Sequence, residues 1–210
     1  MEFTYTSTEE TEVLICCENN LTSLINIHFP LGLKRLFCHS NKLENIDNLP
    51  QGLELLYCGY NQLTSLTALP ESLTSLTCDH NPLMGLLNLP TDLKDLSCNA
   101  VQLTSLPTLP QGLKDLSCSE NRLTSLPALP HGLRSLDCGG NQLMSLVGLP
   151  EGLQELYCWG NQLTGLPAHL PASLTRLDCS NNERLMGLPA YLPEDLLELY
   201  CDEHINIRPF

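Results

Sequence analysis

A unit of twenty residues recurs along this chain and constrains its fold more than any other feature. Residues 111–130 read QGLKDLSCSENRLTSLPALP, one of ten copies of the frame L-x-x-L-x-C-x-x-N-x-L-x-x-L-x-x-L-P. The copies are marked by Cys16, Cys38, Cys58, Cys78, Cys98, Cys118, Cys138, Cys158, Cys179 and Cys201. A short fixed period with leucines at constant offsets is typical of a solenoid, in which each repeat packs on its neighbours. We therefore expect about ten repeats in one solenoid domain (13–201), a short N-terminal cap (1–12) and a tail that closes the last repeat (202–210).

The pattern inside each copy predicts strand on one side of the solenoid and extended chain on the other. Apolar residues alternate at Leu116 and Cys118, which predicts a short strand with both side chains facing inward. The return segment, 123–130, has leucines three residues apart with prolines between them. Proline lacks the N–H that a helix needs and favours extended or polyproline-like backbone. The expected fold is mainly β, with a parallel sheet on the concave side and no helix on the convex side.

An asparagine follows most of the cysteines by three residues, where the chain leaves the strand. A buried amide at this point must satisfy backbone groups of its own turn and of the adjacent turns. The asparagines are Asn19, Asn41, Asn61, Asn81, Asn121, Asn141, Asn161 and either Asn181 or Asn182. Val101 takes this place in the fifth copy. We expect local loosening there, or a water molecule in place of the amide.

The charge of the chain narrows the classes of partner. The formal net charge is −14, whereas nucleic acids and anionic membranes are bound through clustered Lys and Arg. We therefore expect neither as a partner. The sequence has no signal-peptide core and no apolar run of 18 residues, which predicts a soluble protein without a classical export signal.

The cysteines read as structural residues. Ten of the eleven occupy one repeat position. Equivalent side chains on parallel strands lie about 4.8 Å apart, farther than the roughly 3.8 Å between the Cβ atoms of a disulfide. We predict a ladder of buried, reduced thiols in a reducing environment, with no metal site and no cofactor.

The unit LPxGLxxLxCxxNxLTSLP resembles the leucine-rich repeats of bacterial effectors. It is most similar to the short, YopM-like class, which also forms the repeat domains of bacterial effector ubiquitin ligases. The likeness covers residues 13–201 and implies a right-handed solenoid, secretion into the host-cell cytoplasm and binding of host proteins. Cysteine stands where the family usually has Leu, Val or Ile, and we expect no ligase domain in this chain.

Partner contacts should come from outward-pointing strand residues, because packing fixes the inward ones. Tyr and Trp are common binding anchors, and an acidic groove attracts basic partners. The predicted partner-binding residues are Phe37, Tyr57, Asp79, Asp95, Asp115, Asp137, Tyr157, Trp159, Asp178 and Tyr200. They would suit a protein or long peptide, a basic one in particular, bound by a monomer. The competing interpretation is that the aromatic rings pack on cross-strand neighbours and the carboxylates only maintain solubility.

Three other functions stay open at this point. The chain could be the substrate-recognition part of a larger enzyme such as a ubiquitin ligase. It could be an enzyme itself, through the paired Asp95 and Asp115, through His39 and His80 near the concave face, or through Cys17, which lies off the ladder. No nucleophile with an orienting base is apparent, so we predict no catalytic residue. A redox- or metal-responsive protein built on the thiols is the third alternative.

Overall fold

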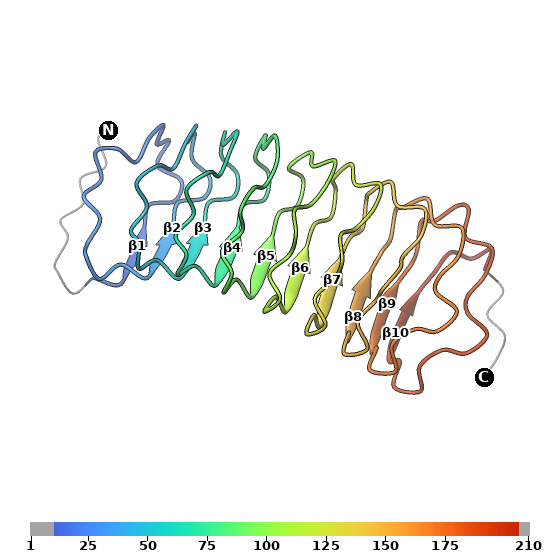
Figure 1. Cartoon of the computed structure of the whole chain (residues 1–210). Coiled ribbons are helices and arrows are strands. Elements are labelled where there is room, and N and C mark those ends of the chain that lie inside the picture. Colours follow the sequence, from blue (N-terminus) through green and yellow to red (C-terminus); the bar gives the residue numbers. More distant parts are fainter. Residues whose placement is uncertain (1–10, 206–210) are drawn as a thin grey trace.

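Ten parallel strands, one per repeat, form a single sheet along one side of an elongated solenoid (Figure 1). The computed structural model describes residues 11–205. The strands are β1 (Val13–Ile15), β2 (Arg35–Phe37), β3 (Leu55–Tyr57), β4 (Ser75–Thr77), β5 (Asp95–Ser97), β6 (Asp115–Ser117), β7 (Ser135–Asp137), β8 (Glu155–Tyr157), β9 (Arg176–Asp178) and β10 (Glu198–Tyr200). They follow one another in sequence order, and between residues 11 and 205 the chain forms no helix. The predicted fold class is confirmed.

The register of the sheet follows from the repeat. Leu96 pairs with Leu116, and Leu116 pairs with Leu136, so the same frame position stacks in each turn. The leucine at the centre of strands β1–β9 is buried, and the return-segment leucines pack against this core from the other side. The sheet therefore presents a regular outward surface, the concave face, made by the first and third residue of each strand and the residue that follows the cysteine.

The cysteines form the predicted buried ladder. All eleven are free thiols, and those from Cys16 to Cys179 at the repeat position are fully buried. Several also donate to the next repeat, as Cys78 Sγ does to the carbonyl of Ser97 at 3.4 Å. Burial raises the pKa of the Cys179 thiol to about 12. Cys17, off the ladder, and Cys201, in the last repeat, are only half-buried.

The asparagine ladder connects consecutive turns. Asn61 donates from Nδ2 to the carbonyls of Cys38 and Cys58, and its Oδ1 accepts from the N–H of Leu43 at 3.0 Å. Asn182, rather than Asn181, continues this pattern and is fully buried. Asn19 is exposed, and its amide reaches only the carbonyl of Cys17, so the expectation of a buried amide in the first repeat is wrong.

The expected loosening at Val101 is also wrong. Val101 is fully buried, and its N–H donates to Asn121 Oδ1 at 3.3 Å. In other repeats an asparagine side-chain oxygen at this position accepts a hydrogen bond from the equivalent leucine N–H. Here the N–H of Leu83 instead donates to the carbonyl of Asn81 at 2.9 Å. The valine thus fills the space of the amide, and a short local bond replaces the missing one.

The predicted cap and tail are described only in part, because residues 1–10 and 206–210 lie outside the described range. Both remain predictions.

Candidate functional site

A shallow hollow lies in the middle of the concave face, across β4–β8. Its volume is about 240 Å³, and its lining includes Asp95, Asp115, Asp137 and Tyr157. The leucines at the centres of β4, β5 and β6 also line it, between the outward hydroxyls of Thr77, Ser97 and Ser117. Four of the ten predicted partner-binding residues therefore border one depression, although they come from four different repeats.

Asp95 and Asp115 are direct partners in the register of β5 and β6. Both side chains are exposed. Partial burial raises the pKa of Asp95, a hydrogen bond with Asp115 and the charge of that neighbour raise it further, and Lys94 opposes the shift. Like charges placed opposite each other destabilise a sheet. A positively charged group in the hollow would relieve this repulsion.

Asp79 belongs to an internal hydrogen-bond network. Its Oδ1 accepts from Ser97 Oγ at 2.8 Å and from the N–H of Asn99 at 2.7 Å. Asn99 Oδ1 in turn accepts from Ser117 Oγ at 2.9 Å and from the N–H of Ser119 at 2.7 Å. The carboxylate of Asp79 thus ties β4 to β5, and its acceptor capacity toward a partner is reduced.

Asp137 and Asp178 cap the turns that follow their own strands. Asp137 Oδ1 accepts from the N–H of Gly139 at 3.1 Å, and Asp178 Oδ1 accepts from the N–H of Ser180 at 3.0 Å. Burial raises the pKa of Asp137, while hydrogen bonds from Gly139, Ser119 and Ser117 oppose the shift. These two aspartates are half-buried, so they face the concave side but also shape it.

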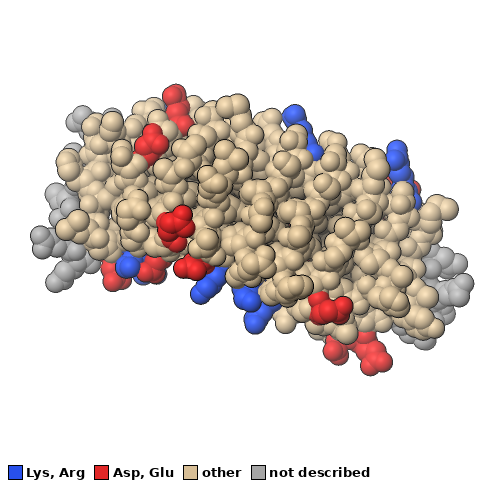
Figure 2. Space-filling model, in the orientation of Figure 1, with Lys and Arg blue, Asp and Glu red and all other residues tan. Residues whose placement is uncertain are grey.

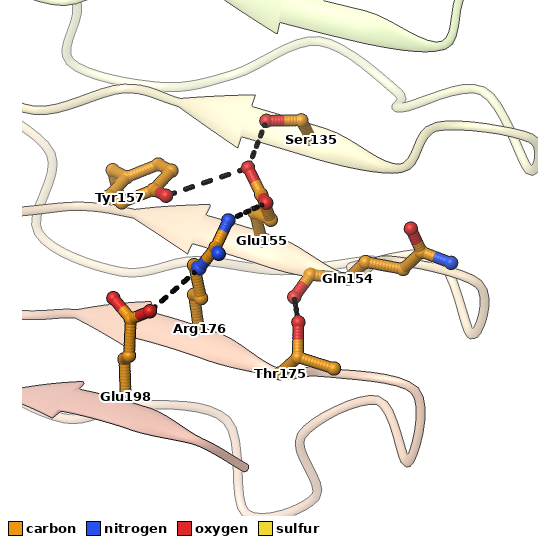
Figure 3. Close-up of polar contacts among 7 residues, drawn as sticks. All are labelled: Ser135, Gln154, Glu155, Tyr157, Thr175, Arg176 and Glu198. Carbon is orange, nitrogen blue, oxygen red and sulfur yellow. Dashed lines mark hydrogen bonds and ion pairs between the residues drawn. The ribbon is translucent and has the colours of Figure 1, made fainter. Parts of the chain in front are cut away.

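A charged network lies on β8–β10 and includes Tyr157, which also lines the hollow (Figure 3). Arg176 on β9 lies between two carboxylates, with Nη1 2.5 Å from Glu155 Oε1 on β8 and Nε 3.1 Å from Glu198 Oε1 on β10. The hydroxyl of Tyr157 donates to Glu155 Oε2 at 3.5 Å. Burial, followed by the charge of Glu155, raises the pKa of Tyr157. The hydrogen bond to Glu155 orients the tyrosine ring on the sheet.

Trp159 lies against a glycine pair of the preceding repeat. A Cβ atom built on Gly139 would stand 2.3 Å from the indole Nε1, and one on Gly140 would stand 3.3 Å from the outer edge of the ring. Gly140 also has a positive φ of 59°, which disfavours a side chain there. The half-buried indole thus has a fixed place on the sheet, and part of it remains accessible to a partner.

The N-terminal part of the concave face carries an aromatic cluster. The ring of Tyr57 lies 6.3 Å from that of Phe37, edge to face, and 4.6 Å from that of His39. Tyr60 stacks on His80 at 4.2 Å in the adjoining turns. The two histidines therefore pack on different tyrosines instead of forming a pair.

The predicted residues fall into three groups along the sheet. Phe37 and Tyr57 lie at the N-terminal end, the hollow occupies the middle, and Trp159, Asp178 and Tyr200 extend toward the C-terminal end. Tyr200 is 57% exposed. Phe37, Tyr57 and Trp159 do pack on cross-strand neighbours, as the competing interpretation expects, but each of these residues stays partly exposed.

The Glu155–Arg176–Glu198 network was not predicted from the sequence. Its signal was present, because the three residues occupy the same repeat position in consecutive copies with alternating charge. Side chains at equivalent positions of paired strands are close enough for ion pairs. Alternation of charge down one repeat position is therefore a usable signal for such networks.

The chain is similar to solved structures from bacteria. YopM from Yersinia enterocolitica WA-314 matches with a TM-score of 0.68 and 30% identity over 92% of this chain and 56% of that one. The chain is a leucine-rich repeat protein. The leucine-rich repeat domain of a Shigella effector matches with a TM-score of 0.61 and 28% identity over 93% of this chain and 73% of the domain. The predicted resemblance to bacterial effector repeats is confirmed.

A third match also contains stacked cysteines. The functional domain of InlJ from Listeria monocytogenes, which includes a cysteine ladder, matches with a TM-score of 0.65 and 25% identity over 94% of this chain and 55% of that one. This leucine-rich repeat chain spans little more than half the length of the YopM and InlJ chains. No protein-family model and no curated protein sequence matches it.

Two further properties bear on function. No helix within residues 11–205 is long and apolar enough to cross a membrane. Over the same range, no group of three or more His, Cys, Asp and Glu side chains is placed to hold a metal ion.

Proposed function

We propose that this protein is a non-enzymatic scaffold that binds a protein or a long peptide on its concave face. The observation that carries the proposal is the central hollow, where Asp95, Asp115 and Tyr157 converge between two aromatic regions. Ten strands spaced about 4.8 Å apart give a face on the order of 43 Å long, enough for a folded partner or an extended segment. Aromatic anchors beside a desolvated depression are the usual centres of protein interfaces.

The charge of the hollow favours a partner with a basic side chain. Asp95 and Asp115 repel each other, and a guanidinium or ammonium group between them would remove that cost. Arginine suits such a site because its planar fork can bond two carboxylates at once. The net charge of −14 would also attract a basic partner over longer distance. The chain itself is expected to act as a monomer.

The similarity to YopM and to the Shigella effector domain supports a role as a secreted bacterial effector. In that role the partner would be a host protein, met in the reducing cytoplasm of the host cell. Eleven free thiols and the negative charge fit this setting and disfavour nucleic acid or an anionic membrane as the target.

Affinity capture from host-cell lysate tests the proposal with two matched variants. The site variant carries Asp95→Asn, Asp115→Asn and Tyr157→Ala. The control variant carries Glu151→Gln, Asp195→Asn and Tyr191→Ala, which removes the same charge and the same ring from exposed positions off the concave face. A partner retained by the wild type and the control, and lost by the site variant, is the expected result. Equal retention by all three would place binding elsewhere.

A further inference from the structure

Three cations stand in line at the rim of the sheet where the strands begin. Lys94, Lys114 and Arg134 immediately precede β5, β6 and β7 and occupy the same repeat position. They are three of only ten Lys and Arg residues in a chain with a net charge of −14. Figure 2 shows basic side chains, with acidic ones beside them, on the lower rim of the molecule, from which the strands of Figure 1 rise. We call these three residues the basic row.

The backbone holds the basic row in fixed register. The N–H of Lys114 donates to the carbonyl of Lys94 at 2.7 Å, and the N–H of Arg134 donates to that of Lys114 at 2.8 Å. Neighbouring members are therefore about 4.8 Å apart, and the row spans about 10 Å. Lys114 Nζ also donates to the carbonyl of Gly132 at 3.3 Å, and the absence of a side chain on Gly132 makes room for it.

Side chains at this repeat position can form ion pairs between neighbouring repeats when their charges are opposite. Lys34 and Glu54 occupy it in the second and third repeats and form an ion pair at 2.8 Å. The ion pairs within residues 11–205 are this one and the two of Arg176, so no carboxylate comes within pairing distance of the basic row. The charge of Lys94 does act on neighbouring Asp95, but neither forms an ion pair. The three adjacent cations repel one another, and an external anion bound to them would offset this repulsion.

The spacing of the basic row favours an α-helical partner. Residues i and i+7 of a helix are about 10.5 Å apart on one face, close to the span of the row. Three alternate residues of an extended strand cover about 13 Å and fall out of step with it. Asp95 and Asp115 directly follow Lys94 and Lys114 and lie on the concave face beside the row. They would repel acidic residues on the side of the helix that covers the sheet, so that side cannot be acidic.

We propose that the basic row docks a helix of a partner protein that carries acidic residues along one flank, at i, i+3 or i+4, and i+7. The helix runs along the solenoid axis, with its acidic flank on the rim. This surface borders the central hollow, because Asp95 and Asp115 of the hollow directly follow Lys94 and Lys114, but it uses different side chains of the opposite charge.

A peptide titration at low ionic strength tests the proposal, with amide chemical shifts as the readout. The probe is a helical peptide of about 18 residues, built of Ala and Gln with glutamates at i, i+3, i+7 and i+10. A scrambled peptide has the same composition with its glutamates spread around the helix, and an oligothymidylate of equal charge serves as the nucleic-acid probe. The row variant is Lys94→Gln, Lys114→Gln and Arg134→Gln; the matched control is Lys42→Gln, Arg122→Gln and Arg184→Gln.

The flanked peptide should shift the amides around the basic row in the wild type and in the control variant. The row variant should bind it about tenfold more weakly, as expected for the loss of three exposed ion pairs. Unchanged spectra elsewhere in the row variant would show that the fold is kept. No binding of the flanked peptide, equal binding of the scrambled peptide, tighter binding of the oligothymidylate, or equal weakening in the control variant would each overturn the proposal.

Discussion

The buried asparagines act at the scale of single residues, each serving several backbone groups. Asn121 Oδ1 accepts from the N–H groups of Val101 and Leu103, and its Nδ2 lies within 3.0 Å of the carbonyls of Cys118 and Ser119. One side chain therefore satisfies groups in two repeats. Val101 shows that a single amide can be dispensed with when an apolar side chain fills its volume and the orphaned N–H finds a local carbonyl.

Asn121→Ala should lower the free energy of unfolding by about 3 kcal/mol, because it leaves several buried backbone groups without partners and opens a cavity. Urea unfolding followed by circular dichroism measures the change. Asn19→Ala is the control and should cost less than about 0.5 kcal/mol, since Asn19 is exposed. Similar losses in both variants would mean that the buried hydrogen bonds are not the source of stability.

The contact between Trp159 and Gly139 gives a second prediction at this scale. Gly139→Ala places a methyl group where the indole lies, so the ring must move and become more exposed. We expect a red-shifted fluorescence emission and a loss of about 1–3 kcal/mol in stability. Trp159 is the one tryptophan of the chain, so the signal has a single source.

Gly152→Ala is the matched control for this experiment, because nothing lies within 4 Å of the added Cβ atom. An unchanged emission spectrum in Gly139→Ala would contradict the described position of the indole.

At the scale of the repeat element, the cysteine ladder should make the free energy of unfolding fall as the pH rises into the alkaline range. Burial raises the pKa of the ladder thiols above the ordinary value of 9.0, to about 12 for Cys16 and Cys138. A raised folded-state pKa means that the native protein keeps protons which the unfolded chain releases. The stabilisation is complete below about pH 9 and is lost as pH rises toward the folded-state pKa.

Each ladder thiol should remove about 1.4 kcal/mol of stability per pH unit above about pH 9. With nine buried ladder thiols the protein should unfold near pH 10, because domains of this kind are stable by only about 5–15 kcal/mol. The triple variant Cys78→Ala, Cys98→Ala and Cys118→Ala should have a slope shallower by about 4 kcal/mol per pH unit. Chemical denaturation between pH 8 and pH 10 measures the slope, and identical slopes would contradict a buried thiol ladder.

Much of the structure of each repeat could be predicted, because each repeat sets the strand register of the next. A twenty-residue period with Leu116 and Cys118 facing inward leaves a single register for parallel strands, and β5–β7 adopt it. The local outcome at Val101 could not be predicted, because it depended on which carbonyl the N–H of Leu83 could reach. Strict spacing would have chosen Asn182, which lies three residues after Cys179; the choice stayed open because the insertion after this repeat shifts the frame.

At the scale of the whole molecule, the sequence predicted which residues face outward but not what they do there. Asp79 and Asp115 occupy outward positions, yet Asp79 is bonded within the sheet while Asp115 lines the hollow. Asp79 follows a cysteine whereas Asp115 begins a strand, and Ser97 and Asn99 of the next repeat reach the carboxylate of Asp79. Such differences depend on side-chain conformation, which a repeat pattern does not specify.

The molecule thus presents two charged surfaces of opposite sign, the hollow and the basic row, on a scaffold whose core is uniform along its length. Most of the variation between repeats lies at outward positions, so one solenoid can carry several contacts without a change in fold.

Site-specific photo-crosslinking tests the central claim, binding on the concave face, most directly. A photoreactive phenylalanine derivative would replace either Tyr157, in the hollow, or Tyr191, which is 81% exposed in a return segment. Illumination in host-cell lysate should yield a discrete crosslinked partner from position 157, and position 191 should yield none. The Asp95→Asn and Asp115→Asn substitutions should abolish the adduct at position 157. A partner captured equally or better from position 191 would contradict the account and place the binding surface on the convex side.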